Sequence, residues 1–346
     1  MSERSFFRRL FEPRSIEEQS PAAKGLTYAL LLLWTMVVLV PLYWVLITSF
    51  KGAGDVDNGP FYIPFVDFKP NLNAWDFMLI QNNTIGPYLN SVVVALASTV
   101  LALLIGSLAA YALVRIHFRV KLAAVGLFIV LLLCVIVAVV TLGIAWPVAV
   151  AVALALFLIG LFTFVGRTRP AVGNNDIEFW IISNRIMPPI VAVLPIYVMF
   201  QQLRLLDTQV ALIATYAAVN LPIVVWLTRD FFAAIPIDLE ESAQLDGASK
   251  FRVFFTIALP LVRSGLVATF LLVLILAWNE YLLALFLSNA NAQTMPVLVS
   301  AQNTTRGPQW WNMSVLIVVM IAPVVVIASV LQKHIARGLL VGAVKG

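Results

Sequence analysis

Eight long runs of apolar residues decide what this 346-residue chain can fold into. The bilayer core needs about 20 apolar residues in one helix, and each run meets or approaches that length. The runs also lack the two-residue alternation of membrane β-barrel strands. The sequence therefore predicts an all-α polytopic membrane protein with about eight transmembrane helices. They are expected over residues 26–49, 88–114, 122–145, 147–166, 179–202, 210–228, 264–287 and 313–331.

The composition excludes several other classes of protein. Only 11% of the residues are charged and 62% are hydrophobic, whereas a soluble domain carries about 25% charged residues. A soluble enzyme is therefore excluded, and so is intrinsic disorder. Cys134 is the single cysteine, and the two histidines, His117 and His334, lie far apart. These residues give no disulfide framework, metal centre or nucleophilic triad, so we expect no cofactor and no enzymatic activity.

The positions of Lys and Arg predict the orientation in the membrane. With a cytoplasmic N-terminus and eight alternating spans, only four of the 22 basic residues fall in outer loops, and Arg185 lies near or within a span. Cytoplasmic loops of membrane proteins carry such an excess of positive charge. We therefore expect both termini in the cytoplasm, and the net charge of +5 needs no nucleic acid as a partner. The four outer residues are Lys51, Lys69, Arg204 and Arg306.

The runs divide the chain into a cytoplasmic N-terminal segment, 1–25, and a membrane domain, 26–346. The first run is too long for the core of a signal peptide, so it is expected to stay as a membrane anchor. Only Ala145, Trp146 and Pro147 separate the third and fourth runs, which could form a tight hairpin or one broken unit. In the outer segment 289–312, tryptophans suit an interfacial belt or the docking of an external partner.

One long loop, 229–263, is predicted on the cytoplasmic side. Asp238 can cap a helix there, and Glu241 three residues later completes a capping-box-like pair. We expect a short helix over 239–246, followed by Gly247 in the left-handed conformation that ends many helices. A second short helix is expected from Ser249 to Ile257. Leu259-Pro260 would then turn the chain into the next span.

The first of these short helices has an acidic face. A helix that rests on lipid usually presents Lys and Arg, whereas this one carries Glu240, Glu241 and Asp246. Anionic lipid would repel these side chains. The pattern therefore favours a socket in another protein over the lipid surface.

The loop resembles the "EAA" loop of ABC importer permeases. The resemblance rests on Glu-Glu-Ser-Ala-Gln-Leu-Asp-Gly-Ala-Ser at 240–249, followed by Ile-Ala-Leu-Pro at 257–260. Further features are similar to the carbohydrate-importer branch, in particular the maltose-type second permease. They are Trp278-Asn279-Glu280-Tyr281, Met187-Pro188-Pro189 and the tail 337–346. The resemblance covers most of 26–121 and 177–346, and 122–176 departs from it as a probable inserted pair of spans.

The resemblance implies a permease subunit of the bacterial cytoplasmic (inner) membrane that forms half of a pathway for a sugar, oligosaccharide or polyol. It implies two separate ATP-binding subunits, a second homologous permease and an extracytoplasmic solute-binding protein. The chain itself has no phosphate-binding loop of the form G-x-x-x-x-G-K-[ST]. The residues expected to couple to the ATPase are Glu240, Glu241, Ala243, Asp246, Gly247, Leu259 and Pro260.

A second group of residues is expected along the substrate pathway. Glu280 lies within a predicted span beside Trp278, Asn279 and Tyr281, and such a group suits a sugar ring and its hydroxyls. The alternative is a structural hydrogen bond between helices. Arg185 is either functional or snorkels to the inner surface. Pro188 distorts its span, which either lines a cavity or is a packing kink.

Two other functions fit the membrane architecture. An ion-coupled secondary transporter of a small polar solute would need titratable groups inside the membrane and often has internal repeats. Glu280 is the single acidic residue well inside a predicted span. A non-transporting scaffold would leave the acidic loop and the proline-containing spans unexplained. An ATP-driven importer accounts for both the acidic loop and the proline-containing spans.

Overall fold

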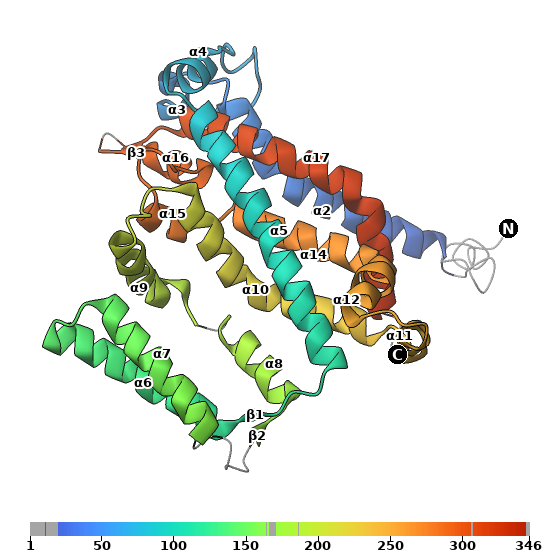
Figure 1. Ribbon diagram of the computed structural model, residues 1–346. Helices are drawn as coiled ribbons and strands as arrows, with labels where there is room; N and C mark the ends of the chain where they lie inside the picture. Colours follow the sequence, from blue (N-terminus) through green and yellow to red (C-terminus); the bar gives the residue numbers. More distant parts are fainter. Residues whose placement is uncertain are drawn as a thin grey trace. The chain divides into compact units, whose positions relative to one another are not determined.

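The structure, a computed structural model (Figure 1), describes residues 11, 20–163, 165, 171–185, 187–305 and 307–343. The side chains of residues 140 and 331–343 are not part of this description. Most of the predicted N-terminal segment 1–25, together with Arg167, Arg169 and Arg306, lies outside the described residues. The side chains of the tail 337–346 also lie outside them.

The chain divides into two compact units. The first comprises Met1–Leu89 and Gln293–Val326, and the second comprises Asn90–Ala292 and Ile327–Gly346. Two of the three boundaries fall within helices α5 (Ile85–Arg115) and α17 (Trp310–Ala343), and the third, between Ala292 and Gln293, falls in a loop. Each unit has its own core of buried apolar residues.

Six of the described helices are long and apolar enough to cross a membrane. They coincide with six of the eight predicted spans and confirm an all-α polytopic fold. The six are α2 (Pro21–Thr48), α5, α6 (Leu122–Leu142), α7 (Trp146–Thr163), α10 (Gln209–Ala233) and α17.

The other two predicted spans are interrupted helices. The run 179–202 forms α8 (Asn174–Ser183) and α9 (Pro189–Gln202), because consecutive prolines remove backbone donors and disfavour helix before them. The run 264–287 forms α14 (Arg263–Trp278) and α15 (Leu282–Leu287), with a break at residues 279–281. Within a bilayer, such irregular backbone is tolerated where protein buries it or where it lines a cavity.

The first unit is built on short elements around one apolar cluster. Besides α2 and the start of α17, it contains a π-helical turn, η1 (Phe77–Gln81), and an antiparallel pair of two-residue strands. Its core consists of Ala74, Met78, Met295, Leu298, Val315 and Leu316. The remaining elements are α3 (Ala53–Asp57), α4 (Asn73–Asp76), α16 (Met295–Ala301), β3 (Asn303–Thr304) and β4 (Gly307–Pro308).

Small residues allow the long helices of the second unit to pack closely. The buried face of α5 carries Ala102, Gly106 and Ala110 at intervals of four residues. At Gly106, an added Cβ would lie 2.6 Å from Cγ1 of Val224 on α10, so a side chain has no room there. Transmembrane helices associate through such small positions because the lipid supplies no hydrophobic driving force between helices. Helix α14 packs on the same α10.

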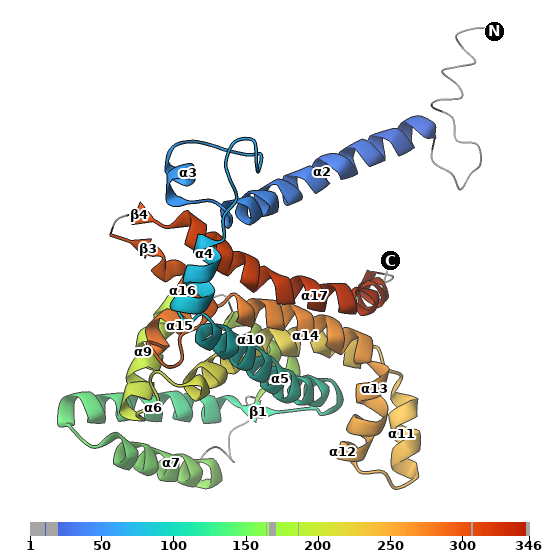
Figure 2. The same ribbon diagram turned by 90° about the horizontal axis from the view of Figure 1, so that it is seen from above.

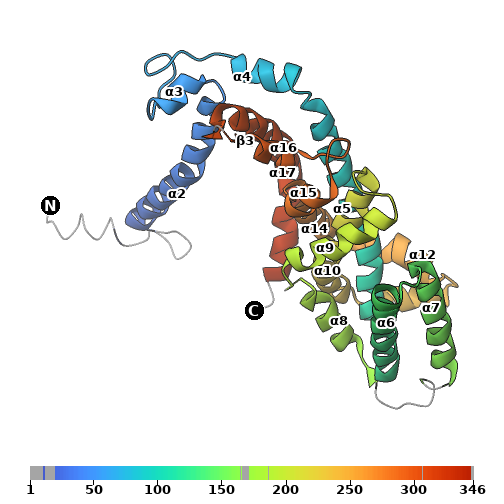
Figure 3. The ribbon, with the colours of Figure 1, turned by 90° about the vertical axis from the view of Figure 1, so that its left-hand side faces the viewer.

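Helices α6 and α7, within the predicted insertion, form a closed hairpin. They run side by side (Figure 3), and the rings of Phe128 and Phe157 lie 6.0 Å apart in edge-to-face contact. Of the two alternatives left open by the sequence, the structure has the hairpin. Its base is joined by an antiparallel pair, β1 (Val120–Lys121) with β2 (Ala171–Val172). The chain therefore leaves and rejoins the helical core at one place.

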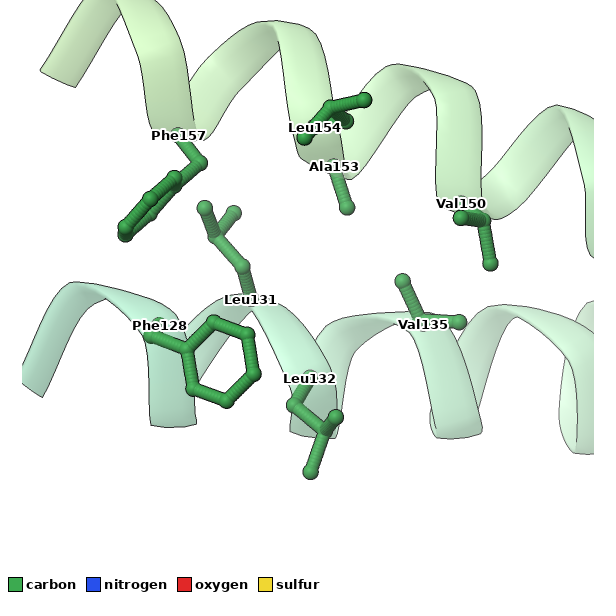
Figure 4. Close-up of a pocket in the computed structure, with 8 residues that line it drawn as sticks. All are labelled: Phe128, Leu131, Leu132, Val135, Val150, Ala153, Leu154 and Phe157. Atoms are coloured by element: carbon green, nitrogen blue, oxygen red, sulfur yellow. The ribbon is translucent and has the colours of Figure 1, made fainter. Parts of the chain in front are cut away.

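The space between α6 and α7 is an apolar cavity of about 250 Å³ (Figure 4). Its lining side chains are hydrocarbon throughout, as expected for a hairpin that faces lipid acyl chains. They are Phe128, Leu131, Leu132, Val135, Val150, Ala153, Leu154 and Phe157.

Candidate functional site

The loop that follows α10 forms two short helices side by side (Figure 2). The first is α11 (Ile237–Leu245), and the second runs through α12 (Lys250–Val253), η3 (Phe254–Ala258) and α13 (Leu259–Leu261). Helix α11 begins at Ile237, two residues earlier than predicted, and no side chain caps it. The predicted cap by Asp238 and its capping-box pair with Glu241 are therefore wrong. Pro236, with φ −58° and ψ 130°, already directs the chain into the helix.

Helix α11 ends as the sequence predicts. Gly247 has φ +87°, a conformation that costs L-residues about 1–2 kcal/mol. The N–H of Ala248 donates to the carbonyl of Ala243 and that of Gly247 to the carbonyl of Gln244, both at 3.0 Å. These two bonds form a Schellman motif, which satisfies carbonyls at the end of the helix.

The second short helix also starts where the sequence predicts. The side chain of Ser249 accepts a hydrogen bond from the backbone N–H of Arg252. The helix continues past Pro260, and the chain then bends by 80° between Leu261 and Arg263 to enter α14. Leu259 packs against the aromatic core beneath the loop, whereas Pro260 is exposed.

Glu240 is buried against α5, with only 2% of its surface exposed. Its Oε2 accepts a hydrogen bond of 2.6 Å from the hydroxyl of Tyr111, and its Oε1 lies 2.8 Å from both Nε and Nη2 of Arg115. The sequence predicts that Glu240 lies on an acidic face that enters a socket in another protein, but its carboxylate faces the interior of this protein. Ala243, one turn later on the same face, is half-buried.

Arg115, the last residue of α5, contacts both α11 and the end of α10. Besides Glu240, its guanidinium donates to the carbonyls of Phe232 at 3.2 Å and Ile235 at 2.8 Å, where α10 ends. The aromatic rings of Tyr111, Phe232 and Phe254 surround the pair, with centroids 5.0–5.8 Å apart. A buried ion pair persists when hydrogen bonds satisfy both partners, as they do here.

The opposite side of the loop is exposed and partly apolar. We call this the outward face, made of Leu239, Glu241, Leu245, Asp246 and Phe251. Leu245 is 89% exposed and Phe251 71% exposed, at adjoining ends of the two short helices. Large apolar side chains that are exposed on a polar loop are typical of a surface that binds another protein.

The residues predicted along the substrate pathway lie at the interruption between α14 and α15. The amide of Asn279 donates to the carbonyl of Ile275 at 2.8 Å, and Oε1 of Glu280 accepts from the N–H of Leu283 at 3.0 Å. Glu280 thus caps the start of α15, while Trp278 is buried and Tyr281 is exposed. These two side-chain bonds lie within one segment. A hydrogen bond between helices is also present here, because the hydroxyl of Tyr216 on α10 donates to the backbone carbonyl of Glu280 at 3.2 Å.

Arg185 and Pro188 lie at the other interruption. Arg185 is exposed just after α8, and its Nη1 donates to the carbonyl of Val219 on α10 at 3.3 Å. Pro188 is the residue before the first turn of α9. The coupling residues and Glu280 are not brought into one site, because the 16 residues of α14 separate them by about 24 Å.

Sequence reasoning missed Asp207, which holds together the loops before α10 and after α15. Its carboxylate accepts hydrogen bonds from the backbone N–H groups of Asn289, Ala290, Asn291 and Ala292, at 2.7–3.2 Å. Burial would raise the pKa of Asp207, but these donors together hold it below its usual value. The side-chain amide of Asn291 donates a further hydrogen bond of 3.0 Å. The sequence carries no pattern for this contact, since backbone groups supply most of the donors.

Residues 164–341 match the family described as the binding-protein-dependent transport system inner membrane component. This match covers just over half of the chain. The chain belongs to this family. It is thus an ABC-importer permease, an inner-membrane transport component and not an enzyme.

Two relatives match almost the whole permease. It is 28% identical over 317 residues to the diacetylchitobiose uptake system permease protein of Streptomyces coelicolor, covering 90% of this chain and 86% of the relative. It is 29% identical over 321 residues to the trehalose/maltose transport system permease protein of Thermococcus litoralis, covering 91% and 94%.

The fold also resembles a solved structure, a bacterial ABC transporter involved in the import of the acidic polysaccharide alginate. The TM-score is 0.58 at 20% sequence identity, over 90% of this chain and 96% of that chain. At this identity the likeness supports the fold alone.

Proposed function

We propose that this permease forms half of the translocation pathway for a sugar, oligosaccharide or polyol, and that its cytoplasmic loop couples the pathway to separate ATPase subunits. Relatives named for the uptake of diacetylchitobiose and of trehalose or maltose support the carbohydrate class. The family name supports a solute-binding protein as a partner. The assembly would contain two ATP-binding subunits, a second homologous permease and this chain, with both termini in the cytoplasm.

The observation that carries the coupling proposal is the two-sided character of the loop. On one side, Glu240 is buried in contact with Arg115 and Tyr111, so the loop is fastened to α5 and to the end of α10. On the other side, Leu245 and Phe251 are exposed and available to a partner. A push on the outward face would therefore move α5, α10 and α14 as packed bodies, which is the usual form of such transitions.

This arrangement assigns different roles to the predicted coupling residues. Glu241 and Asp246 contact the ATPase, while Glu240 and Ala243 hold the loop on the membrane domain. Gly247 permits the turn between the two short helices. Leu259 and Pro260 support the second helix where the chain bends into α14.

The coupling proposal is tested by reversing one charge and removing one apolar side chain on the outward face. We expect Glu241→Lys combined with Leu245→Asp to abolish co-purification of ATPase chains with the tagged permease, measured by mass identification of the bound chains. ATP-driven uptake of sugar is also expected to fall to background. The matched control is Asp76→Lys, an exposed acidic residue in the first unit, which should leave both unchanged. Normal ATPase association in the double variant would refute the coupling role.

We assign the substrate pathway to the two helix interruptions, with Trp278, Asn279, Glu280 and Tyr281 at one and Arg185 and Pro188 at the other. Interrupted helices expose backbone polar groups that need protein, water or substrate as partners. We expect Asn279→Ala and Glu280→Gln to raise the KM for uptake at least fivefold in the assembled transporter. An unchanged KM in both would remove the first interruption from the pathway.

The sequence alone also leaves open an ion-coupled secondary transporter, because Glu280 lies within a predicted span, but membership of the binding-protein-dependent transport family disfavours it. The two are separated by collapsing the proton and sodium gradients with ionophores while ATP is supplied. Uptake by an ABC importer should persist, whereas ion-coupled uptake would stop.

A further inference from the structure

A cavity of about 470 Å³ lies in the first unit, beyond the C-terminal end of α2. Two indole side chains, Trp44 and Trp310, line it together with Thr48, Lys51 and Asp57. Its volume falls within the range of about 300–1,000 Å³ typical of small-ligand sites. By the distribution of Lys and Arg, this end of α2 is predicted to face the outside.

Thr48 supplies an unused hydrogen-bonding group in this cavity. The residue is only 2% exposed, and its Oγ1 has no hydrogen-bond partner among the described residues. A buried hydroxyl without a partner is costly, and most such groups in proteins are paired. Because Thr48 lines the cavity, a rotation about χ1 would allow this hydroxyl to hydrogen-bond to a ligand that carries hydroxyls.

The charges of the cavity disfavour ions of either sign. Lys51 is buried, donates to the carbonyl of Phe61 and lies 4.3 Å from the ring centroid of Trp44, so it would repel a cation. Burial lowers the pKa of Lys51, and the nearby Asp55 and Asp67 partly offset that effect. The carboxylate of Asp57 would repel an anion but can accept hydrogen bonds from hydroxyls.

We propose that this cavity binds a neutral sugar or polyol, as a site separate from the two helix interruptions. The C–H face of the sugar ring would pack on Trp44 or Trp310, since indoles offer large rigid apolar surfaces. Thr48 and Asp57 would hydrogen-bond to the sugar hydroxyls. The chemical class of the ligand rests on the proposed function, while the site itself rests on the cavity and its lining.

The test measures sugar binding to the whole transporter in lipid nanodiscs, without the solute-binding protein. Equilibrium dialysis with radiolabelled maltose and N,N′-diacetylchitobiose gives the affinity. We expect Thr48→Val, which keeps the shape and removes the hydroxyl, to weaken binding of at least one probe at least tenfold. The matched control is Thr99→Val on α5, since Thr99 is also buried with an unpartnered hydroxyl but does not line this cavity.

A second pair of variants tests the aromatic surface. Trp310→Ala should weaken binding at least tenfold, whereas Trp226→Ala, which removes an exposed tryptophan of α10, should not. Glucose should also bind at least fivefold more tightly than glucosamine or glucuronate, because the cavity holds one charge of each sign. Equal affinity for the three probes would contradict the proposed recognition.

The outcomes separate this site from the proposed function. If Thr48→Val and Trp310→Ala both bind the sugars as the unaltered protein does, or if neither probe binds, the cavity is not a sugar site, even when uptake is intact. If the complex shows no ATP-driven uptake of any sugar, the proposed function fails. The dialysis measurement still decides whether the cavity binds sugar in that case.

Discussion

Two carboxylates in the second unit fasten loops to helices, and they do so in different ways. Glu240 is buried and is held by two side chains, those of Arg115 and Tyr111. Asp207 is half-buried and is held by four consecutive backbone N–H groups of residues 289–292, together with the side-chain amide of Asn291. One contact secures the cytoplasmic loop, and the other secures the loop after α15.

The difference decides which substitutions each contact can tolerate. The contact at Glu240 depends on two particular side chains, those of Arg115 and Tyr111, which lie 125 and 129 positions earlier in the chain. The contact at Asp207 depends mainly on backbone N–H groups that almost any residue can supply, with one side-chain donor, the amide of Asn291. We therefore expect the first to fail when a partner side chain changes, and the second only when Asp207 changes.

The largest expected effect follows from Arg115→Met. It leaves the carboxylate of Glu240 buried without a cation, and breaking a buried pair from one side costs about 3–5 kcal/mol. The thermal unfolding midpoint of the detergent-solubilised permease should fall by many degrees. Adding Glu240→Gln should recover part of the loss, because the uncompensated charge is then removed.

The control for Arg115 is Arg229→Met. Arg229 pairs with Glu178 at 2.8 Å, but its side chain is 33% exposed, so the cost should stay below about 1 kcal/mol. Equal losses in the two variants would contradict the special role of the buried pair.

The next largest effect is expected for Asp207→Asn. Asparagine tolerates the positive φ of +57° at this position, so the backbone should stay unstrained. It retains one acceptor oxygen and loses the charge that strengthens the bonds, which should cost about 1–3 kcal/mol of unfolding free energy. Asn289→Ala should cost much less, since its backbone N–H remains. A larger loss in Asn289→Ala would show that side chains, and not backbone groups, hold the loop.

The sequence predicts the membrane helices better than it predicts the loops and the contacts between them. Apolar runs of about 20 residues place α2, α5, α10 and α17 because a bilayer requires such lengths. The turn at Gly247 is predictable because few residues adopt its backbone conformation. The distortion at Pro188 is predictable because two consecutive prolines interrupt the run. The break at residues 279–281 is less so, since no proline marks it and apolar residues flank it on both sides.

The contacts of Glu240 and Asp207 could not be predicted from the sequence. The acidic pattern of the loop suggests an exposed face, but the rotation of α11 about its axis, set by its start after Pro236, turns Glu240 inward. In the sequence alone, Arg115 is recognisable only as a basic residue at the end of a predicted span. For Asp207, the partners are backbone groups 82–85 residues later, which no residue type reveals.

A smaller effect is expected at Gly247, which has a positive φ like Asp207 but no side chain. An added Cβ would meet nothing within 4 Å, so Gly247→Ala costs only the backbone strain, about 1 kcal/mol. Gly247→Asn should cost less than Gly247→Ala, because asparagine tolerates the left-handed region. The unfolding midpoints of the two variants test this order, and the reverse order would show that contact with a neighbour, not φ, limits the position.

The smallest effect is the acid sensitivity of the Asp207 contact. Because the backbone donors lower the pKa of Asp207 in the folded protein, its stabilising contribution is complete above the unfolded value of about 3.9. It is lost as the pH falls from there through the lower folded pKa, where both states bind the proton. The gap in unfolding midpoint between the unaltered protein and Asp207→Asn should therefore be constant from pH 7 to 5 and narrow below about pH 4. A gap that widened between pH 7 and 5 would mean that the folded pKa of Asp207 is raised, because the folded protein would then bind the proton more readily than the unfolded chain. The N–H groups would then not hold the carboxylate as a charged acceptor.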